Sequence, residues 1–553
     1  MSPHEQRIVR FLSRPGAYPH PAGRIERRET HVSHVFLAGP FAYKLKKSVR
    51  FPFLDASTLA RRRRFCRLEL SLNRRLTPRT YLGLAPVVET PGGLRLGGRG
   101  RVIEWVVKMR RLPEERMLDR LLATRQVSRR HVEQIADRLM RFFRSAARSR
   151  AIGQYGLPAQ VAALVLGNLV ECRPFVGQIL SPDDYARFES AYRQWLALHE
   201  PLLARRVRQR RIIDGHGDLR CENICLTKPV EPRPLAHNTA FASMRGDTPP
   251  TGSMDLVGGV SIFDCVEFQP AFRCGDVVND LAFLVMDLEV RGRHDLARTL
   301  VERCRRGLRD PDLDRLLPLY KCHRALVRAK VRAFAWQQHP RTAQGRRLRQ
   351  LARRHVELAL RYARELGQPR LIVVGGLIGT GKSTLARGLA EAFGAVWLRT
   401  DEIRLREFAR ARRPGQGFSE GLYAPHISDL VYQRLIRRAE ALLRAGRTVV
   451  CDGTFSKAAG REILRDIARQ HQASFHFFEC VVPRRVALQR IAKRYAAKSD
   501  LSEAQPEHYD RLREGFEPVR GWSRRDWTRI SDDRQAQATF QAALTVLRRA
   551  WSG

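Results

Sequence analysis

The chain has 553 residues, too many for one ordinary hydrophobic core, and this length favours about two to four domains. Hydrophobic residues make up 43% of the sequence, enough for buried cores, and no apolar run reaches the roughly 18 residues of a membrane helix. The N-terminus has no apolar stretch of the signal-peptide kind, so we expect a cytoplasmic protein with no membrane partner.

Basic residues strongly outnumber acidic ones: 101 Lys and Arg stand against 56 Asp and Glu, a formal net charge of +45. The excess runs through both halves of the chain, and a field of this sign attracts anions such as nucleotides and nucleic acid. Most of these residues are arginines, so a general compositional preference for arginine accounts for much of the excess. Anionic or neutral small molecules are the favoured partners, and nucleic acid is the less favoured one.

The ten cysteines are scattered along the chain and form no Cys-x-x-Cys pair. Cys221 and Cys225 are four positions apart, but no second pair or histidine cluster completes a zinc set. We therefore expect reduced, mostly buried thiols.

The first elements of the chain are a hairpin and a helix. Residues 30–47 carry two short alternating apolar runs on either side of Ala-Gly-Pro, a β-hairpin pattern. Residues 57–76 open with Ser-Thr and continue with a helical pattern. Strand-like runs follow at 84–88 and 102–108, and long helical stretches at about 114–148, 182–204 and 293–365. Residues 228–259 are rich in Pro, Gly and Ser without a period and are interpreted as a flexible insert.

A catalytic-loop motif lies in the first half. Residues 216–223 read His-Gly-Asp-Leu-Arg-Cys-Glu-Asn and fit H-x-D-x-x-x-x-N, the catalytic loop of kinase folds, in which the histidine braces the loop. Asp218 would accept the proton of an acceptor hydroxyl, and Asn223 would coordinate Mg²⁺. The next apolar run ends in Asp264, where a second carboxylate for Mg²⁺ belongs, with Glu267 close by.

A kinase fold also needs a lysine on an early strand and a glutamate on the next helix. Lys44 ends Phe-Ala-Tyr-Lys, which aligns with the motif Val-Ala-Ile-Lys at its alanine and lysine, and Lys46 points to the same face and is the alternative. Glu69 is the only acid in its arginine-rich helix, yet no charged residue lies three or four positions away. Its partner should therefore come from elsewhere in the fold, and Lys44 or Lys46 is the candidate.

These residues resemble the aminoglycoside phosphotransferase and choline kinase group over roughly residues 25–335. The resemblance implies a protein-kinase-like two-lobed fold for residues 1–365 and a site for ATP and Mg²⁺. No Gly-x-Gly-x-x-Gly loop precedes the lysine, so a shorter hairpin around Gly39 would have to cover the phosphates. Aminoglycosides themselves are polycations, and the positive charge of this half of the chain disfavours them as acceptors.

The second half begins after a helix break at 366–369 with an apolar strand from Leu371. Residues 376–383 then read Gly-Leu-Ile-Gly-Thr-Gly-Lys-Ser, which is G-x-x-x-x-G-K-[ST] between a strand and a helix. Backbone N–H groups and the helix N-terminus would surround the phosphates, Lys382 would contact the β and γ phosphates, and Ser383 would coordinate Mg²⁺. The expected ATP-binding residues are Gly376, Gly379, Thr380, Gly381, Lys382, Ser383 and Thr384.

Two carboxylates follow later strand-like runs, Asp401 after Ala-Val-Trp-Leu-Arg-Thr and Asp452 after Arg-Thr-Val-Val-Cys. Because the carboxyl ends of parallel strands face one crevice, both should converge with Lys382. One carboxylate can take a proton from an acceptor hydroxyl while the other holds Mg²⁺ or its water, and the residues alone leave the assignment open.

A basic helix face comes after the fourth strand, with Arg490, Arg494 and Lys498 at four-residue spacing. It suits either a lid that closes over the transferring phosphate or an ordinary solvated face.

Residues 366–553 resemble P-loop kinases of small substrates, such as gluconate kinase, chloramphenicol phosphotransferase and the kinase half of polynucleotide kinase, and AAA-type predicted kinases. The P-loop, Thr-Asp-Glu-Ile-Arg at 400–404, Cys-Asp-Gly-Thr at 451–454 and the arginines of the lid carry the likeness. It implies an α/β domain, with helices on both faces of a parallel sheet and an arginine-bearing lid, beside the α+β first domain. It also implies that Asp401 is the acceptor-side base, which leaves Asp452 for Mg²⁺.

The whole chain resembles a bacterial family of predicted bifunctional proteins. We expect an ATP-dependent phosphotransferase with two ATP and Mg²⁺ sites that acts on hydroxyl groups of small molecules. One alternative is a P-loop kinase or ATPase whose N-terminal kinase-like domain is catalytically silent and senses a ligand. The other is a nucleic-acid end kinase or binding protein, which the lack of an aromatic stacking motif beside the basic residues disfavours.

Overall fold

The computed structural model describes residues 2–51, 54–227, 259–408, 421–497, 507–531 and 535–551. The chain forms two compact units, Met1–Leu157 with Arg206–Arg324 and Pro158–Arg205 with Ala325–Gly553. Residues 158–205 and 325–365, which the sequence grouped with the first domain, thus cluster with the second unit, and the boundary at 365/366 stays a prediction. Of the insert expected at 228–259, all but residue 259 lies outside the described residues.

The first unit contains a six-stranded antiparallel sheet in the order β1-β2-β3-β8-β6-β7. Its strands are β1 Glu26–Glu29, β2 Ser33–Ala38, β3 Phe41–Lys46, β6 Tyr81–Thr90, β7 Gly93–Leu96 and β8 Arg101–Arg110. The hairpin expected in 30–47 is confirmed as β2 and β3, in which Ala38 lies opposite Phe41. The strands expected at 84–88 and 102–108 fall within β6 and β8.

Helix α2, Leu59–Arg74, confirms the helix expected in 57–76, and the Thr58 side chain caps it by accepting from the Arg61 N–H. The stretch expected to be helical at 114–148 is broken into α3, Leu118–Ala123, and α4, Arg129–Ser145, because Ser128 starts a new helix through a capping box with His131. The other α-helices and β-strands described in this unit are α1 Pro3–Leu12, β4 Arg50–Phe51, β5 Leu54–Asp55, α5 Arg150–Gly153, β9 Ile212–Asp214, β10 Ile224–Leu226, β11 Val260–Ile262, α8 Pro270–Arg273, β12 Cys274–Asp276, α9 Val277–Val290 and α10 His294–Leu308.

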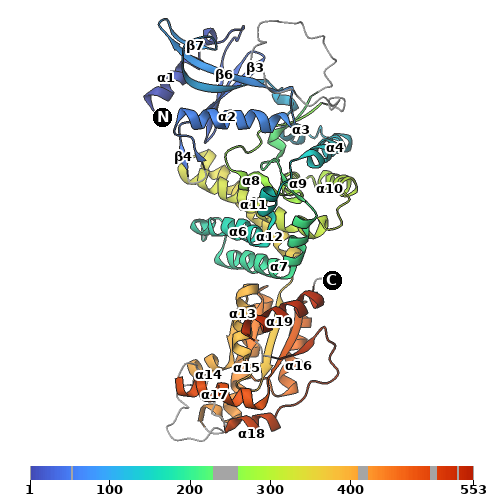
Figure 1. Ribbon diagram of the computed structural model, residues 1–553. Coiled ribbons are helices and arrows are strands. Elements are labelled where there is room, and N and C mark those ends of the chain that lie inside the picture. Colours follow the sequence, from blue (N-terminus) through green and yellow to red (C-terminus); the bar gives the residue numbers. More distant parts are fainter. Residues whose placement is uncertain are drawn as a thin grey trace. The chain divides into compact units, whose positions relative to one another are not determined.

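The second unit is built on a five-stranded parallel sheet in the order β14-β15-β13-β16-β17. Side chains alternate along β13 (Arg370–Gly376), so its two faces pack on different helices. Val373 packs against α15 (Pro425–Arg444) and α16 (Ala458–Gln470), and Ile372 packs against α13 (Lys382–Phe393) and α19 (Ala536–Trp551). Helices therefore cover both faces of the sheet, as expected (Figure 1). The strands are β13 Arg370–Gly376, β14 Val396–Arg399, β15 Val449–Asp452, β16 Ser474–Val481 and β17 Trp527–Ser531.

The helices of the second unit are α6 Pro158–Val170, α12 Ala343–Leu366, α13 Lys382–Phe393, α14 Thr400–Phe408, α15 Pro425–Arg444, α16 Ala458–Gln470, α17 Arg484–Ala497, α18 His508–Glu514 and α19 Ala536–Trp551. Helices α7, Pro182–Arg208, and α11, Leu313–Gln338, contribute residues to both units. The helical stretch expected at 293–365 is three helices, α10, α11 and α12.

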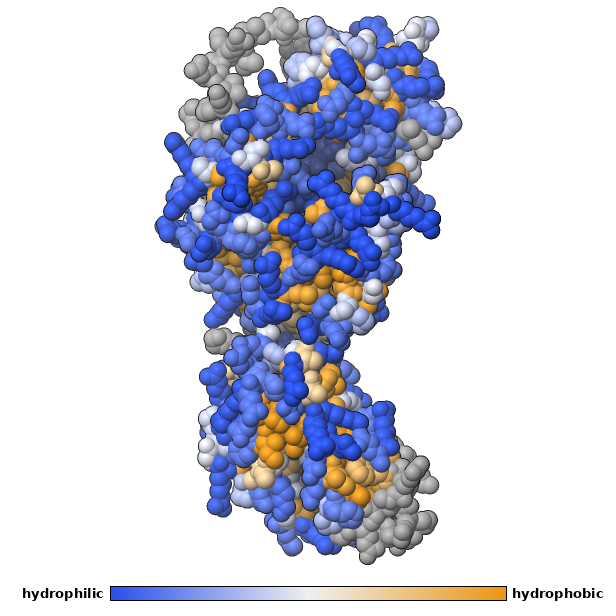
Figure 2. Space-filling view, turned by 180° about the vertical axis from the view of Figure 1, so that it is seen from behind, coloured by the Kyte–Doolittle hydropathy of each residue, from blue (hydrophilic) through white to orange (hydrophobic). Residues whose placement is uncertain are grey.

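Hydrophilic side chains dominate the visible surface, and apolar ones gather in separate patches (Figure 2). No helix in the described ranges combines the length and apolarity needed to cross a bilayer. All ten cysteines are free and buried, which confirms the expectation of buried thiols.

Candidate functional site

The loop between β13 and α13 is shaped by its glycines. Gly376, Gly379 and Gly381 have φ angles of 139°, 75° and 80°, in the region that favours glycine. A Cβ on Gly379 would lie 2.6 Å from the carbonyl oxygen of Ala487 in α17, so a side chain does not fit there. Backbone conformation and close packing against α17 thus both require glycine here, and a phosphate-binding loop needs a glycine-rich backbone of this kind.

Lys382 and Ser383 open helix α13 directly after this loop, with Thr384 next in the first turn. The Thr380 hydroxyl closes the loop by donating to the Leu377 carbonyl at 2.7 Å, and Lys382 Nζ lies 3.4 Å from the same oxygen. The ammonium group and the N-terminus of a 12-residue helix therefore meet at the loop, as an anion site requires.

Asp452 ends β15, the neighbour of β13, and is only 3% exposed. Burial raises the pKa of its carboxyl, and the attraction of Lys382, the hydrogen bond with Ser383 and the charge of Arg399 only partly offset that effect. The carboxylate thus lies beside the lysine and serine, in surroundings that disfavour its charged form. A divalent cation would remove that penalty, so the serine and the aspartate fit a Mg²⁺ site.

Asp401 lies in the first turn of α14, immediately after β14. Its negative charge acts on Asp452 and raises the pKa of that carboxyl further, so the two carboxylates share one edge of the sheet with Lys382. Arg404, one turn on, is buried and donates to the Ser428 hydroxyl at 3.3 Å. The structure therefore brings together three charged residues that the sequence expected to converge.

Helix α17 carries Arg490 and Arg494 and packs on the P-loop. Its residues Ala487 and Ile491 form an apolar cluster with Ile378 of the loop. Both arginines are partly buried, and Lys498 lies outside the described residues. The basic helix thus contacts the loop itself, where a lid over the phosphates would have to be.

The first unit holds a row of alternating charges, all buried except the partly exposed Asp264. Lys44 Nζ lies 2.8 Å from Glu69 Oε1 and 2.6 Å from Asp264 Oδ1. Lys46 Nζ lies 2.5 Å from Glu69 Oε2 and also contacts Glu267. Both lysines that the sequence offered as partners of Glu69 therefore bind it at once.

Within this row of charges, the ion pairs offset most of the effect that burial has on the pKa values. Burial alone would raise the pKa of Glu69, but the two lysines bring it down to about 2. Burial alone would lower the pKa of Lys44, but Asp264 and Glu69 raise it well above its ordinary value. For Glu267 burial prevails: its pKa is raised in spite of Lys46. Glu69, Lys44 and Lys46 are thus held in their charged forms.

The motif at 216–223 is anchored by a residue that sequence reasoning missed, Asp280 of α9. Its Oδ1 accepts from the Gly217 N–H at 2.8 Å, and its Oδ2 accepts from the His216 N–H at 2.5 Å. The His216 ring lies between the Phe263 carbonyl, 3.0 Å from Nε2, and the Asp218 N–H, 3.2 Å from Nδ1. Burial lowers the pKa of this histidine, so it braces the loop as a neutral ring. The sequence feature that could have identified Asp280 is a charged residue within the apolar run of α9.

Strands β10 and β11 form a short ladder in which Ile224 pairs with Ile262. This ladder positions Asp218, Asn223 and Asp264. Asn223 Nδ2 donates to Asp218 Oδ2 at 3.0 Å, and Asp264 has a φ of 64°, unusual for a residue other than glycine. Arg220 holds the Asp218 carboxylate through two hydrogen bonds of 2.8 Å each, a contact that the sequence analysis did not foresee.

Comparisons with known proteins cover both halves of the chain. Residues 371–519 match the family described as AAA domain. The uncharacterized protein Rv2004c of Mycobacterium tuberculosis (strain ATCC 25618 / H37Rv) is 32% identical over 481 residues, which cover 86% of this chain and 88% of that protein. The uncharacterized protein Mb2027c of Mycobacterium bovis (strain ATCC BAA-935 / AF2122/97) matches with the same identity and coverage.

Solved structures match over about a third of the chain. A sugar kinase from Janibacter sp. HTCC2649 has 20% identity and a TM-score of 0.26, covering 32% of this chain and 94% of its own. A gluconokinase from Sinorhizobium meliloti 1021 has 21% identity and a TM-score of 0.27, covering 33% and 94%. The APS kinase CysC of Mycobacterium tuberculosis, in complex with AMPPNP and APS, has 19% identity and a TM-score of 0.26, covering 33% and 98%.

Proposed function

This chain belongs to the same protein family as the mycobacterial protein Rv2004c, and we propose that it is an ATP-dependent phosphotransferase acting on hydroxyl groups of small molecules. The observation that carries this proposal is the meeting of Lys382, Ser383 and Asp452 beside a glycine-shaped loop. A lysine, a hydroxyl and a carboxylate in this arrangement are the protein groups that phosphoryl transfer from ATP requires.

In this reaction the acceptor oxygen bonds to the γ-phosphorus while the bond to the ADP oxygen breaks. Lys382 stabilises the charge on the phosphates, and Asp401 takes the proton of the acceptor hydroxyl. Ser383 and Asp452 would hold Mg²⁺, which neutralises phosphate charge when bound. Arg490 and Arg494 are placed on the helix that contacts the loop, where their charge can act on the transferring group.

A second ATP site lies, in this proposal, in the first unit, with a protein-kinase-like two-lobed fold related to aminoglycoside phosphotransferases. The buried ion pair of Lys44 and Glu69 supports it, because such a pair fixes a lysine for phosphate contact. Asn223 and Asp264 would hold Mg²⁺, and Asp218 would be the base. The protein would then be bifunctional.

One contact favours a second candidate function for the first unit. The Asp218 carboxylate accepts from Arg220 through both of its oxygens, so part of its capacity to accept from a hydroxyl is taken up in this conformation. A unit that keeps this contact would bind ATP or a metabolite without transferring phosphate, as a silent sensor attached to a P-loop kinase.

The acceptors that suit a chain with a net charge of +45 are small anionic or neutral hydroxyl compounds. We propose that the protein meets them in the cytoplasm.

The test is ATP consumption by the full-length chain against a library of hydroxyl-bearing metabolites, repeated with Lys382→Ala and with Asp218→Asn. Two acceptors, each lost with one of the two variants, are expected for a bifunctional enzyme. Activity lost only with Lys382→Ala would favour the silent sensor. If no metabolite stimulates ATP consumption and only 5′-hydroxyl nucleic acid ends are labelled, the small-molecule proposal is wrong.

A further inference from the structure

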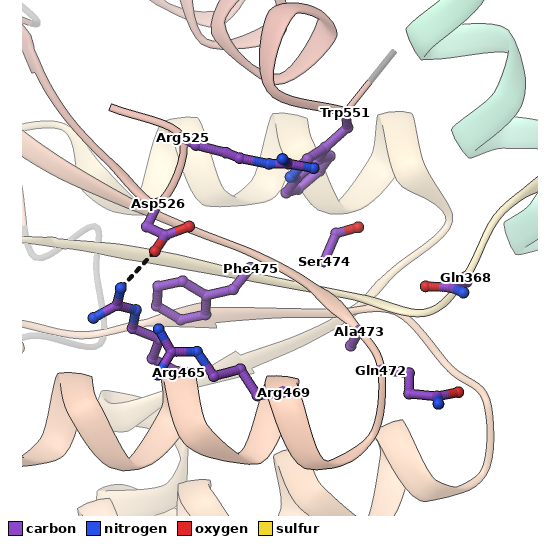
Figure 3. Close-up of a pocket in the computed structure, with 10 residues that line it drawn as sticks. All are labelled: Gln368, Arg465, Arg469, Gln472, Ala473, Ser474, Phe475, Arg525, Asp526 and Trp551. Atoms are coloured by element: carbon purple, nitrogen blue, oxygen red, sulfur yellow. Dashed lines mark hydrogen bonds and ion pairs between the residues drawn. The ribbon is translucent and has the colours of Figure 1, made fainter. Parts of the chain in front are cut away.

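A pocket of about 260 Å³ lies at the amino ends of β13 and β16. Gln368, two residues before β13, and Ser474, the first residue of β16, form part of its wall. Arg465 and Arg469 of α16 and Arg525 surround it (Figure 3). Because the P-loop follows the carboxyl end of β13, this pocket is at the opposite edge of the sheet from the candidate ATP site.

The wall of the pocket carries more positive than negative charge. Arg465 is neutralised by Asp526 at 2.7 Å, an ion pair drawn in Figure 3. Arg469 reaches Asp466 at 3.3 Å but is largely exposed, which weakens that pair. Arg525 has no carboxylate partner among the described residues, so at least one guanidinium at this pocket is uncompensated.

A buried arginine lies behind the pocket wall. Arg370 is 7% exposed, and its guanidinium lies 5.2 Å from the ring centroid of Trp551, which lines the pocket. It contacts the neutral Gln194 side chain, and its Nε has no hydrogen-bond partner in the described structure. Burial lowers its pKa to about 10, so it still carries its charge at neutral pH. No carboxylate among the described residues forms an ion pair with this guanidinium.

The rim of the pocket has a strained residue. Gln472 lines the pocket with a φ of 52° just after α16, a helix end at which glycine is the usual residue. Gln472 therefore places an amide side chain at the rim, where glycine would be conformationally easier.

We propose that this pocket binds a small phosphate-bearing molecule, at a site separate from both candidate ATP sites. Guanidinium groups pair with phosphate through two hydrogen bonds, and Arg469 and Arg525 are the two that remain accessible. The Ser474 hydroxyl and the Gln472 amide supply neutral hydrogen-bonding groups beside them. The volume is below the roughly 300–1,000 Å³ typical of sites for drug-sized ligands, which favours a compact anion.

The experiment is a calorimetric titration of inorganic pyrophosphate into the full-length Lys382→Ala chain, in which the P-loop is disabled. Binding is expected to persist there and to weaken at least about tenfold when Arg469→Gln and Arg525→Gln are added, the loss of one charge-assisted hydrogen bond or more. Arg437→Gln, an exposed arginine of α15 away from the pocket, is the matched control and should leave the affinity unchanged.

Thermal melting of each variant should show that the fold is kept, because both arginines are exposed. The proposal is overturned if Lys382→Ala alone abolishes pyrophosphate binding, if the double substitution leaves it unchanged, or if Arg437→Gln weakens it as much as the double substitution does. The last result would mean that only the general charge of the chain attracts the anion.

Discussion

Lys46 Nζ lies 2.5 Å from Glu69 Oε2, while the other oxygen of the same carboxylate faces Lys44. One buried glutamate thus forms ion pairs with two lysines of the same strand, β3. The sequence left open which of the two lysines pairs with Glu69, and the structure pairs both.

Glu69→Gln should lower the free energy of unfolding by about 3–5 kcal/mol, because it leaves two buried ammonium groups without their shared counter-charge. Denaturant unfolding of the full-length protein measures this change. Glu29→Gln is the control: Glu29 also pairs with a lysine, Lys47, but is about half exposed, so less than about 1 kcal/mol is expected. Equal losses in the two variants would contradict the account.

The contribution of Glu69 should also depend on pH. Its pKa is about 2 in the folded protein against an ordinary value of 4.5, so its ionised form stabilises the fold. The stability difference between the wild-type protein and Glu69→Gln should be complete above about pH 5 and shrink as pH falls from about 4.5 towards 2. A difference that stays constant down to pH 2.5 would show that the ion pairs do not stabilise the fold.

Asp452→Asn should lower the affinity of the P-loop site for Mg²⁺ by about 10- to 100-fold, the usual effect of removing a group that supports a metal site. Without ligands, the Asp452→Asn variant should melt at a higher temperature than the wild-type protein, because a buried carboxyl with a raised pKa is replaced by a neutral amide. Titration of ATP with and without Mg²⁺ measures the first effect. Unchanged Mg²⁺ dependence would remove Asp452 from the site.

Asp218→Asn should reduce phosphotransfer by the first unit about 10²- to 10⁴-fold while ATP binding is retained, because a general base acts on the acceptor proton. Glu222→Gln, on the same loop and also in contact with Arg220, is the matched control and should keep activity. If both substitutions leave turnover unchanged, Asp218 is not the base.

The parts of the fold that follow from local pattern were predictable. The hairpin at Ala38 and Phe41, the capped helix after Thr58 and the P-loop each depend on residues close together in the chain. The break between α3 and α4 was missed because Ser128 and His131 form a capping box without the usual acidic partner.

The convergence of predicted residues was foreseeable, whereas the contacts that individual side chains make were not. The convergence of Asp401 and Asp452 follows from the general geometry of parallel sheets. The anchoring of the His216 loop by Asp280 and the engagement of Asp218 by Arg220 depend on three-dimensional packing and on side-chain conformation. No residue spacing specifies either contact.

The number of ATP molecules bound per chain tests the two-site proposal most directly. Calorimetric titration of the full-length protein with ATP and Mg²⁺ should give two sites, and one site in each of Lys382→Ala and Lys44→Met. Lys457→Ala, an exposed lysine of the second unit, is the control and should keep both sites. A single site in the wild-type protein that disappears completely in Lys382→Ala would contradict the proposal, because the first unit would then bind no ATP.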